Sequence, residues 1–94
     1  MIYCFDLDQT LIETSGGNYA DSKPIQYRID KVNELAKRGD TIIIQTARGK
    51  HWYDFTKNQL LRFNINYHLL SVGDKIYADF YIDDKGYNDK TFFD

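Results

Sequence analysis

The chain has 94 residues, of which 43% are hydrophobic and 16% aromatic, and its formal net charge at pH 7 is −2. This length suits one domain, residues 1–94, and leaves no room for a second. The apolar content is enough to build a core and argues against disorder. A slightly acidic chain has no electrostatic reason to bind nucleic acid in bulk.

The cysteine content and the N-terminal sequence predict the cellular location. The one cysteine, Cys4, lies in an apolar run, which excludes an internal disulfide framework and fits a reducing compartment. No signal peptide, lipidation motif or long apolar stretch is visible. We therefore expect a cytoplasmic protein without a membrane as a binding partner.

Two predicted strands and a helix occupy the first half of the chain. Residues 2–7 are almost wholly apolar, the pattern of a strand buried on both faces of a sheet. A polar loop with a Gly-Gly pair covers residues 13–23. Pro24 then suits the first turn of a helix, which Gly39 is well placed to end. Residues 41–46 predict a second buried strand.

The second half repeats this alternation. A helix is predicted at about residues 51–63, a weaker strand at 67–72 and a fourth strand at 79–82. The polar tail, residues 85–94, receives no assignment, and Asp89 within it is interpreted as a solvated charge. Strands that alternate with helices predict an α/β fold with a parallel sheet and right-handed crossovers.

Two carboxylates, Asp6 and Asp8, follow the first apolar run two positions apart. Side chains at positions i and i+2 of a strand point the same way. Like charges that close are unfavourable unless a cation, a proton or a reaction uses them. The pattern therefore indicates a metal-assisted carboxylate nucleophile with a second carboxyl group as acid and base.

Polar residues also end two other predicted strands. Thr46 closes the second strand, and Asp83 and Asp84 close the fourth. In parallel α/β sheets the site lies beyond the carboxyl ends of the strands. We therefore expect these residues to share a site with the first two aspartates.

The pattern Asp6-x-Asp8-x-Thr10 after a hydrophobic strand resembles the first motif of the haloacid dehalogenase (HAD) superfamily. The later motifs of that family are matched in order by Thr46, by Lys75 and by Asp83 with Asp84. The resemblance spans residues 2–84. It implies a minimal HAD-like Rossmannoid fold, a three-layer sandwich with a short parallel sheet in the order 3-2-1-4 and no cap domain.

Two stretches, residues 43–49 and 78–85, are similar to small capless HAD proteins of capsule or lipopolysaccharide biosynthesis. The resemblance implies that Asp6 attacks phosphorus, making an aspartyl-phosphate, and that Asp8 serves as acid and then base. Thr46 would hydrogen-bond a phosphoryl oxygen, and Lys75 would offset the negative charge.

The same resemblance implies a Mg²⁺ cofactor, which prefers oxygen ligands. Its ligands would be the Asp6 side chain, the Asp8 backbone carbonyl and Asp83, with Asp84 close enough to help. The chain departs from the family pattern at Gln9, where glycine is commonest, so we expect strain there. Its short connections leave the site open, and an oligomer would be one way to cover it.

Arg48 has two open interpretations, as a clamp for a second anionic group of the substrate or as half of a surface ion pair. The predicted function is Mg²⁺-dependent hydrolysis of a small phosphorylated substrate, with a sugar phosphate of surface-polysaccharide biosynthesis as the first candidate. The alternatives are a nucleotide or nucleic-acid-end phosphatase and a non-catalytic binding module with the same fold.

Overall fold

The computed structural model describes residues 1–73, 78–83 and 87–93. Its main sheet has five strands in the order β5-β4-β1-β6-β7, and all four pairings are parallel. The bounds are Ile2–Asp6 for β1, Thr41–Thr46 for β4, Leu69–Val72 for β5, Phe80–Asp83 for β6 and Tyr87–Asn88 for β7. Along the chain β1, β4, β5 and β6 are the first to the fourth of these strands. They therefore follow the predicted order 3-2-1-4, and β1 is the central strand.

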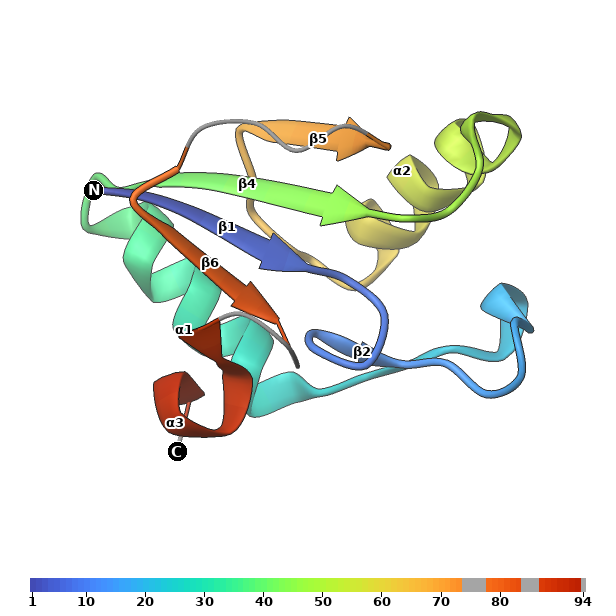
Figure 1. Cartoon of the computed structure of the whole chain (residues 1–94), viewed down its shortest axis with the longest axis horizontal. Helices are drawn as coiled ribbons and strands as arrows, with labels where there is room; N and C mark the ends of the chain where they lie inside the picture. The colour runs from blue at the N-terminus through green and yellow to red at the C-terminus, as the bar shows by residue number, and fades with distance from the viewer. Residues whose placement is uncertain (74–77, 84–86, 94) are drawn as a thin grey trace.

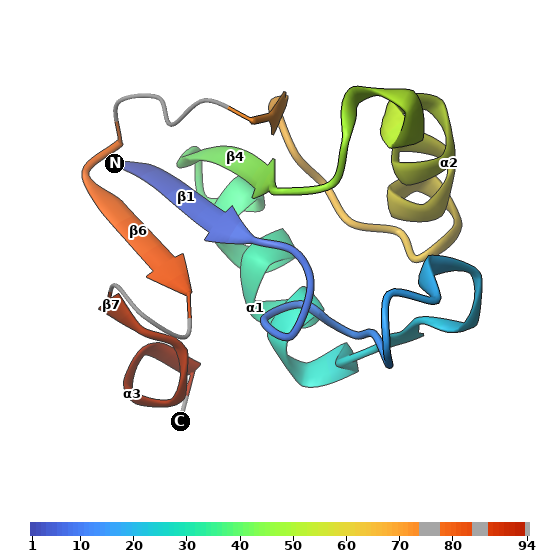
Figure 2. The ribbon, with the colours of Figure 1, turned by 45° about the vertical axis from the view of Figure 1, so that its right-hand side comes forward.

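The carboxyl ends of the longer strands lie at one end of the sheet. The arrowheads of β1, β4, β5 and β6 all point the same way in Figure 1. β7 extends the sheet beyond β6 and leads into α3 (Asp89–Phe93), as Figure 2 shows. The tail that received no assignment from the sequence therefore adds a strand and a short helix.

A small antiparallel pair, β2 (Ile12–Glu13) and β3 (Lys23–Pro24), brackets the polar loop, within which a short 3₁₀ helix covers Tyr19–Asp21. Pro24 pairs with Ile12 in this ribbon and is not part of a helix. Proline has no N–H to donate, and it is tolerated in such a short two-stranded ribbon because no ladder hydrogen bond is lost at its edge. The helix therefore starts two residues later than predicted, at Gln26.

Two longer helices complete the fold. α1 (Gln26–Lys37) ends near Gly39, whose φ of 104° is left-handed, and this confirms glycine as the stop. The second predicted helix is divided into a 3₁₀ turn, Lys50–Trp52, and α2 (Tyr53–Arg62). Among the helices of residues 1–73, 78–83 and 87–93, none combines the length and apolarity needed to cross a membrane.

The larger core lies on one face of the sheet. Tyr3 and Phe5 alternate with Cys4 along β1, and their register partners in β4 are Ile42 and Ile44. All three helices contribute to this cluster, through Ile29, Val32 and Leu35 of α1, Leu60 of α2, and Phe92 and Phe93 of α3. Burial of these side chains is the main force that holds the helices on the sheet.

The opposite face is covered differently. Its buried cluster consists of Cys4, Ile43 and Ala78, where Ala78 belongs to the connection between β5 and β6. No helix of the described ranges joins this cluster. The α/β class, the strand order and, within those ranges, the absence of a cap domain agree with the prediction, but the third layer is thinner than a three-layer sandwich implies.

Candidate active site

Three predicted site residues stand at the carboxyl ends of neighbouring strands. Asp6 ends β1, and its Cα pairs with that of Gln45, one residue before Thr46 at the end of β4. On the other side Phe5 pairs with Ile82. Asp6 and Asp83 are the next residues along β1 and β6. The central strand therefore delivers Asp6 between the two strand ends predicted to form the site.

The chain turns tightly as it leaves β1. The carbonyl of Leu7 accepts hydrogen bonds from the backbone N–H groups of Thr10, Leu11 and Ile12. Gln9 adopts a left-handed φ of 66°, which confirms the predicted strain at this non-glycine position. Its side-chain amide donates to the carbonyl of Thr14, which offsets part of that cost. The turn places Asp8 just past the end of the strand.

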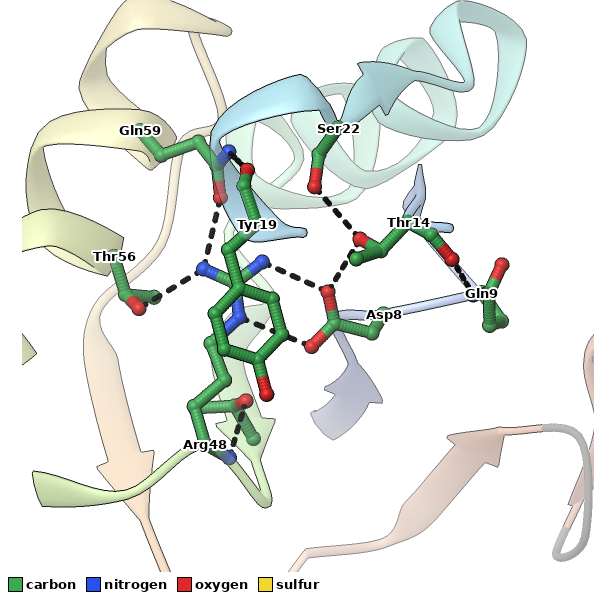
Figure 3. A network of polar contacts seen from close by, with 9 residues as sticks. Asp8, Gln9, Thr14, Tyr19, Ser22, Arg48, Thr56 and Gln59 are labelled. Atoms are coloured by element: carbon green, nitrogen blue, oxygen red, sulfur yellow. Dashed lines mark hydrogen bonds and ion pairs between the residues drawn. The ribbon is translucent and has the colours of Figure 1, made fainter. Parts of the chain in front are cut away.

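Asp8 is held by three donors, as Figure 3 shows. Arg48 approaches side-on, with Nη2 at 2.8 Å from Oδ1 and Nε at 3.0 Å from Oδ2. The Thr14 hydroxyl donates to Oδ1 at 2.7 Å. Two parallel N–H···O bonds between a guanidinium and a carboxylate are the strongest and most directional form of this pair. Asp8 therefore has a fixed orientation, although a quarter of its side chain is exposed.

Arg48 is buried, with only 1% of its side chain exposed. Its Nη1 donates to Thr56 Oγ1 at 3.0 Å and to Gln59 Oε1 at 2.9 Å, and its guanidinium carbon lies 4.1 Å from the centre of the Tyr19 ring. Together with the two bonds to Asp8, these contacts use four of the five N–H donors of the guanidinium within the protein. Neither interpretation from the sequence describes it: Arg48 forms an ion pair, but a buried one with Asp8, and its guanidinium does not face an open site.

Thr46 is buried at the end of β4, and its Oγ1 accepts the backbone N–H of Arg48 at 3.1 Å. A hydroxyl carries one hydrogen and two lone pairs. In the described part of the chain the Thr46 hydroxyl appears in this contact only as an acceptor, so its O–H stays available to a ligand oxygen. This is compatible with the predicted hydrogen bond to a phosphoryl group.

Two predicted residues, Lys75 and Asp84, lie outside the described residues. Within the ranges 1–73, 78–83 and 87–93, no three His, Cys, Asp or Glu side chains gather as a metal site. The predicted Mg²⁺ ligands are of another kind, because they include the backbone carbonyl of Asp8. Asp6, this carbonyl and Asp83 are all oxygen donors, and oxygen donors suit Mg²⁺.

Four residues around Asp8 and Arg48 were not predicted from the sequence: Thr14, Tyr19, Thr56 and Gln59. Thr14 and Tyr19 belong to a polar loop without periodicity, so nothing in the sequence marks them. Thr56 and Gln59 offer a weak signal, since they stand three residues apart on α2 and therefore share one face of the helix. Both are buried there beside Leu60.

The chain matches no protein-family model and no curated protein, but it resembles solved structures. A protein from Vibrio cholerae has a TM-score of 0.73 at 25% identity, over 98% of this chain and 87% of that one. Two structures of the Pnkp1/Rnl/Hen1 complex, one of them described as an RNA repair complex, each have a TM-score of 0.68 at 21% identity over 79% of this chain.

In those two complexes the matching chains are much longer, and the aligned part covers 28% and 25% of them. Identities this low carry the fold and no activity. By its strand order and by these likenesses, the chain is an α/β domain of the fold that all three structures contain.

Proposed function

We propose that the chain is a Mg²⁺-dependent phosphomonoester hydrolase of the HAD type, which acts through an aspartyl-phosphate on Asp6. One observation carries the proposal: Asp8, two residues beyond Asp6 at the end of the central strand, is held in one orientation by Arg48 and Thr14. A carboxyl group fixed in this way supports a division of labour in which Asp6 is the nucleophile and Asp8 moves protons.

The reaction has two steps. An oxygen of Asp6 first attacks phosphorus, the bond from phosphorus to the leaving alcohol breaks, and Asp8 gives its proton to the departing oxygen. Asp8 then takes a proton from water, whose oxygen attacks phosphorus and releases the Asp6 carboxylate. Inorganic phosphate leaves, and Asp8 is protonated for the next cycle. Thr46 donates its hydroxyl hydrogen to a phosphoryl oxygen, and Lys75 is assigned the remaining charge compensation.

The metal is part of the proposal. Asp6, the Asp8 carbonyl and Asp83 would hold Mg²⁺, with Asp84 as a further ligand, and the ion supplies the positive charge that lets an anionic carboxylate approach an anionic phosphate. The sheet register supports this assignment, because Asp6 and Asp83 directly follow the paired residues Phe5 and Ile82 on adjacent strands.

The proposed substrate is a phosphorylated sugar, from the resemblance to capsule and lipopolysaccharide enzymes. A second candidate is a phosphorylated nucleic-acid end, because two structures with the same fold come from the Pnkp1/Rnl/Hen1 complex, described in one case as an RNA repair complex. No cap domain is inserted in the described residues, and an open site admits either class.

The test is a hydrolysis assay with Mg²⁺ on sugar phosphates, nucleotides and oligonucleotides phosphorylated at either end. Asp6→Asn should abolish turnover, because the amide is nearly isosteric but cannot attack phosphorus as an anion. Circular dichroism and the melting temperature check that the variant folds. Wild-type-like turnover in a folded Asp6→Asn protein would contradict the assignment of Asp6 as the nucleophile. If the wild type hydrolyses none of the substrates, the alternative of a non-catalytic binding module would be favoured.

A further inference from the structure

The hydrogen bonds on Asp8 leave one of its two oxygens less occupied than the other. Oδ1 accepts from Arg48 and from Thr14, whereas Oδ2 accepts only from Arg48 among the described residues. A carboxylate offers about four acceptor positions, and these contacts fill three of them. The fourth position, on Oδ2, is where a proton can sit without displacing a donor.

Arg48 is itself fixed from behind. Thr56 and Gln59 of α2 accept hydrogen bonds from its Nη1, and Gln59 also donates to the carbonyl of Tyr19 at 2.8 Å. The Tyr19 ring covers the guanidinium from the loop side, where cation–π attraction holds it. Turning Arg48 toward a ligand would break contacts with three elements of the fold. It therefore acts on Asp8 and not on a substrate.

Thr14 is oriented from the other side. Its single hydroxyl hydrogen is donated to Asp8, so in the contact of 2.7 Å with Ser22 the serine must be the donor. The result is a directed chain from Ser22 through Thr14 to Asp8 Oδ1. Thr14 and Ser22 are both buried, which protects these bonds from competition with water.

We infer that Arg48 and Thr14 are positioning residues that aim Asp8, so that Oδ2 is the atom that gives the proton to the leaving group and takes it from water. The inference rests on the proposed function and adds the proton-carrying atom and the residues that direct it. Arg48 presents its Nε and Nη2 together, and a lysine has one ammonium in place of that fork. Arg48→Lys therefore keeps the positive charge but loses the paired hydrogen bonds that orient the Asp8 carboxylate.

The experiment compares an aryl phosphate, whose leaving group needs little protonation, with an alkyl phosphate, whose leaving group needs a full proton. Arg48→Lys should lower kcat for the alkyl phosphate about 10- to 100-fold, the scale expected when a catalytic group is misplaced by about an ångström. The loss with the aryl phosphate should be much smaller, and KM should change little. Thr14→Val should show the same pattern more weakly, and Thr14→Ser should restore wild-type rates.

The matched control is Arg38→Lys, because Arg38 also pairs with an aspartate, Asp40, but at the far end of β4. It should leave both rates unchanged. In an Asp8→Asn background, Arg48→Lys should add no further selective loss with the alkyl phosphate. Equal losses for both leaving groups, or a raised KM with an unchanged kcat, would overturn the positioning role.

A readout without turnover separates this inference from the proposed function. The Arg48 Nε–H resonance should be protected from exchange in the wild type and lose its protection in Asp8→Asn. Protection that survives Asp8→Asn would overturn the pairing. If the wild type is inactive but the resonance is protected, the proposed hydrolase function is rejected and the Arg48–Asp8 pairing is retained. The proton-transfer role of Oδ2 is then rejected together with the hydrolase.

Discussion

Thr10, in the turn after β1, has a fully buried hydroxyl whose oxygen has no hydrogen-bond partner among the described residues. A buried polar group without a partner costs about 1–3 kcal/mol of stability. Its neighbour in sequence, Gln9, is also unfavourable because of its left-handed backbone. Unfavourable features that cluster at one turn are typical of functional sites.

Replacing Thr10 by valine should therefore stabilise the ligand-free protein. Valine has the same shape, and the substitution removes the unpaired hydroxyl, so we expect the free energy of unfolding to rise by about 1 kcal/mol, at the low end of that penalty. Urea denaturation measures it. Thr56→Val is the control, because Thr56 is equally buried but accepts from Arg48, and it should destabilise the protein. A destabilised Thr10→Val protein would show that the hydroxyl is bonded.

Asp40 predicts a pH dependence of stability. Desolvation raises the pKa of this buried carboxyl group. Hydrogen bonds from the N-terminal ammonium and Arg38, together with their positive charges, lower the pKa by more than desolvation raises it, so the pKa lies below its ordinary value. A lowered pKa in the folded state contributes stability that is complete above the unfolded pKa of about 3.9 and is lost as the pH falls through the folded value.

We therefore expect Asp40→Asn to lower the melting temperature at pH 7, where the wild-type carboxylate is charged and paired. The difference from wild type should shrink as the pH is lowered below about 4. Thermal unfolding followed by circular dichroism at several pH values measures both proteins. A difference that is as large at pH 2 as at pH 7 would mean that Asp40 acts through packing.

At the scale of elements, the short C-terminal helix α3 is attached by a buried ion pair. Arg28 of α1 donates from Nη1 to Asp89 at 2.6 Å and to the carbonyl of Thr10 at 3.0 Å, and its guanidinium lies over the ring of Phe93. Asp89 is therefore not the solvated tail charge predicted from the sequence. One arginine connects α1, α3 and the turn after β1.

Arg28→Met should destabilise the protein by about 3–5 kcal/mol, because it leaves Asp89 buried without its partner. The double variant Arg28→Met/Asp89→Leu should recover much of that loss, since no unpaired charge remains. Chemical denaturation of both variants gives the two values. A double variant as unstable as the single one would show that Arg28 stabilises mainly through Thr10 and Phe93.

At the scale of the whole molecule, the helices are distributed unevenly over the sheet. α1, α2 and α3 all pack on the face that carries Tyr3 and Phe5, while Cys4, Ile43 and Ala78 form the smaller cluster on the other face. The strand ends with Asp6, Thr46 and Asp83 lie at one edge of this sheet. A ligand that joins the ends of β1 and β6 should therefore stabilise the whole sheet.

Mg²⁺ should raise the melting temperature of the wild-type protein, because it binds the folded chain and not the unfolded one. At 100 times its dissociation constant the gain is about 2.7 kcal/mol. Asp83→Asn should reduce the shift, whereas sodium chloride at matched ionic strength should not reproduce it. A melting temperature that stays constant up to millimolar Mg²⁺ would contradict the assigned metal ligands.

The sequence by itself predicted β1, β4, β5 and β6 and the residues at their ends, and the family resemblance implied their order; β2, β3 and β7 were not predicted. Apolar runs followed by polar residues mark buried parallel strands, and the geometry of a parallel sheet then brings Asp6, Thr46 and Asp83 to one edge. The strain at Gln9 was predicted from the family resemblance, because glycine is commonest at this position, and the left-handed φ of 66° confirms it. The proposed chemistry follows from the same residues and stays a prediction.

Only the tertiary structure decided which buried arginine pairs with which aspartate. Arg48 and Asp8 are 40 residues apart, and Arg28 and Asp89 are 61 apart, so no periodicity or spacing connects them. Which buried cation meets which carboxylate depends on how helices and loops pack on the sheet. Local propensity cannot specify such pairs, because their energy exists only when both partners leave water together.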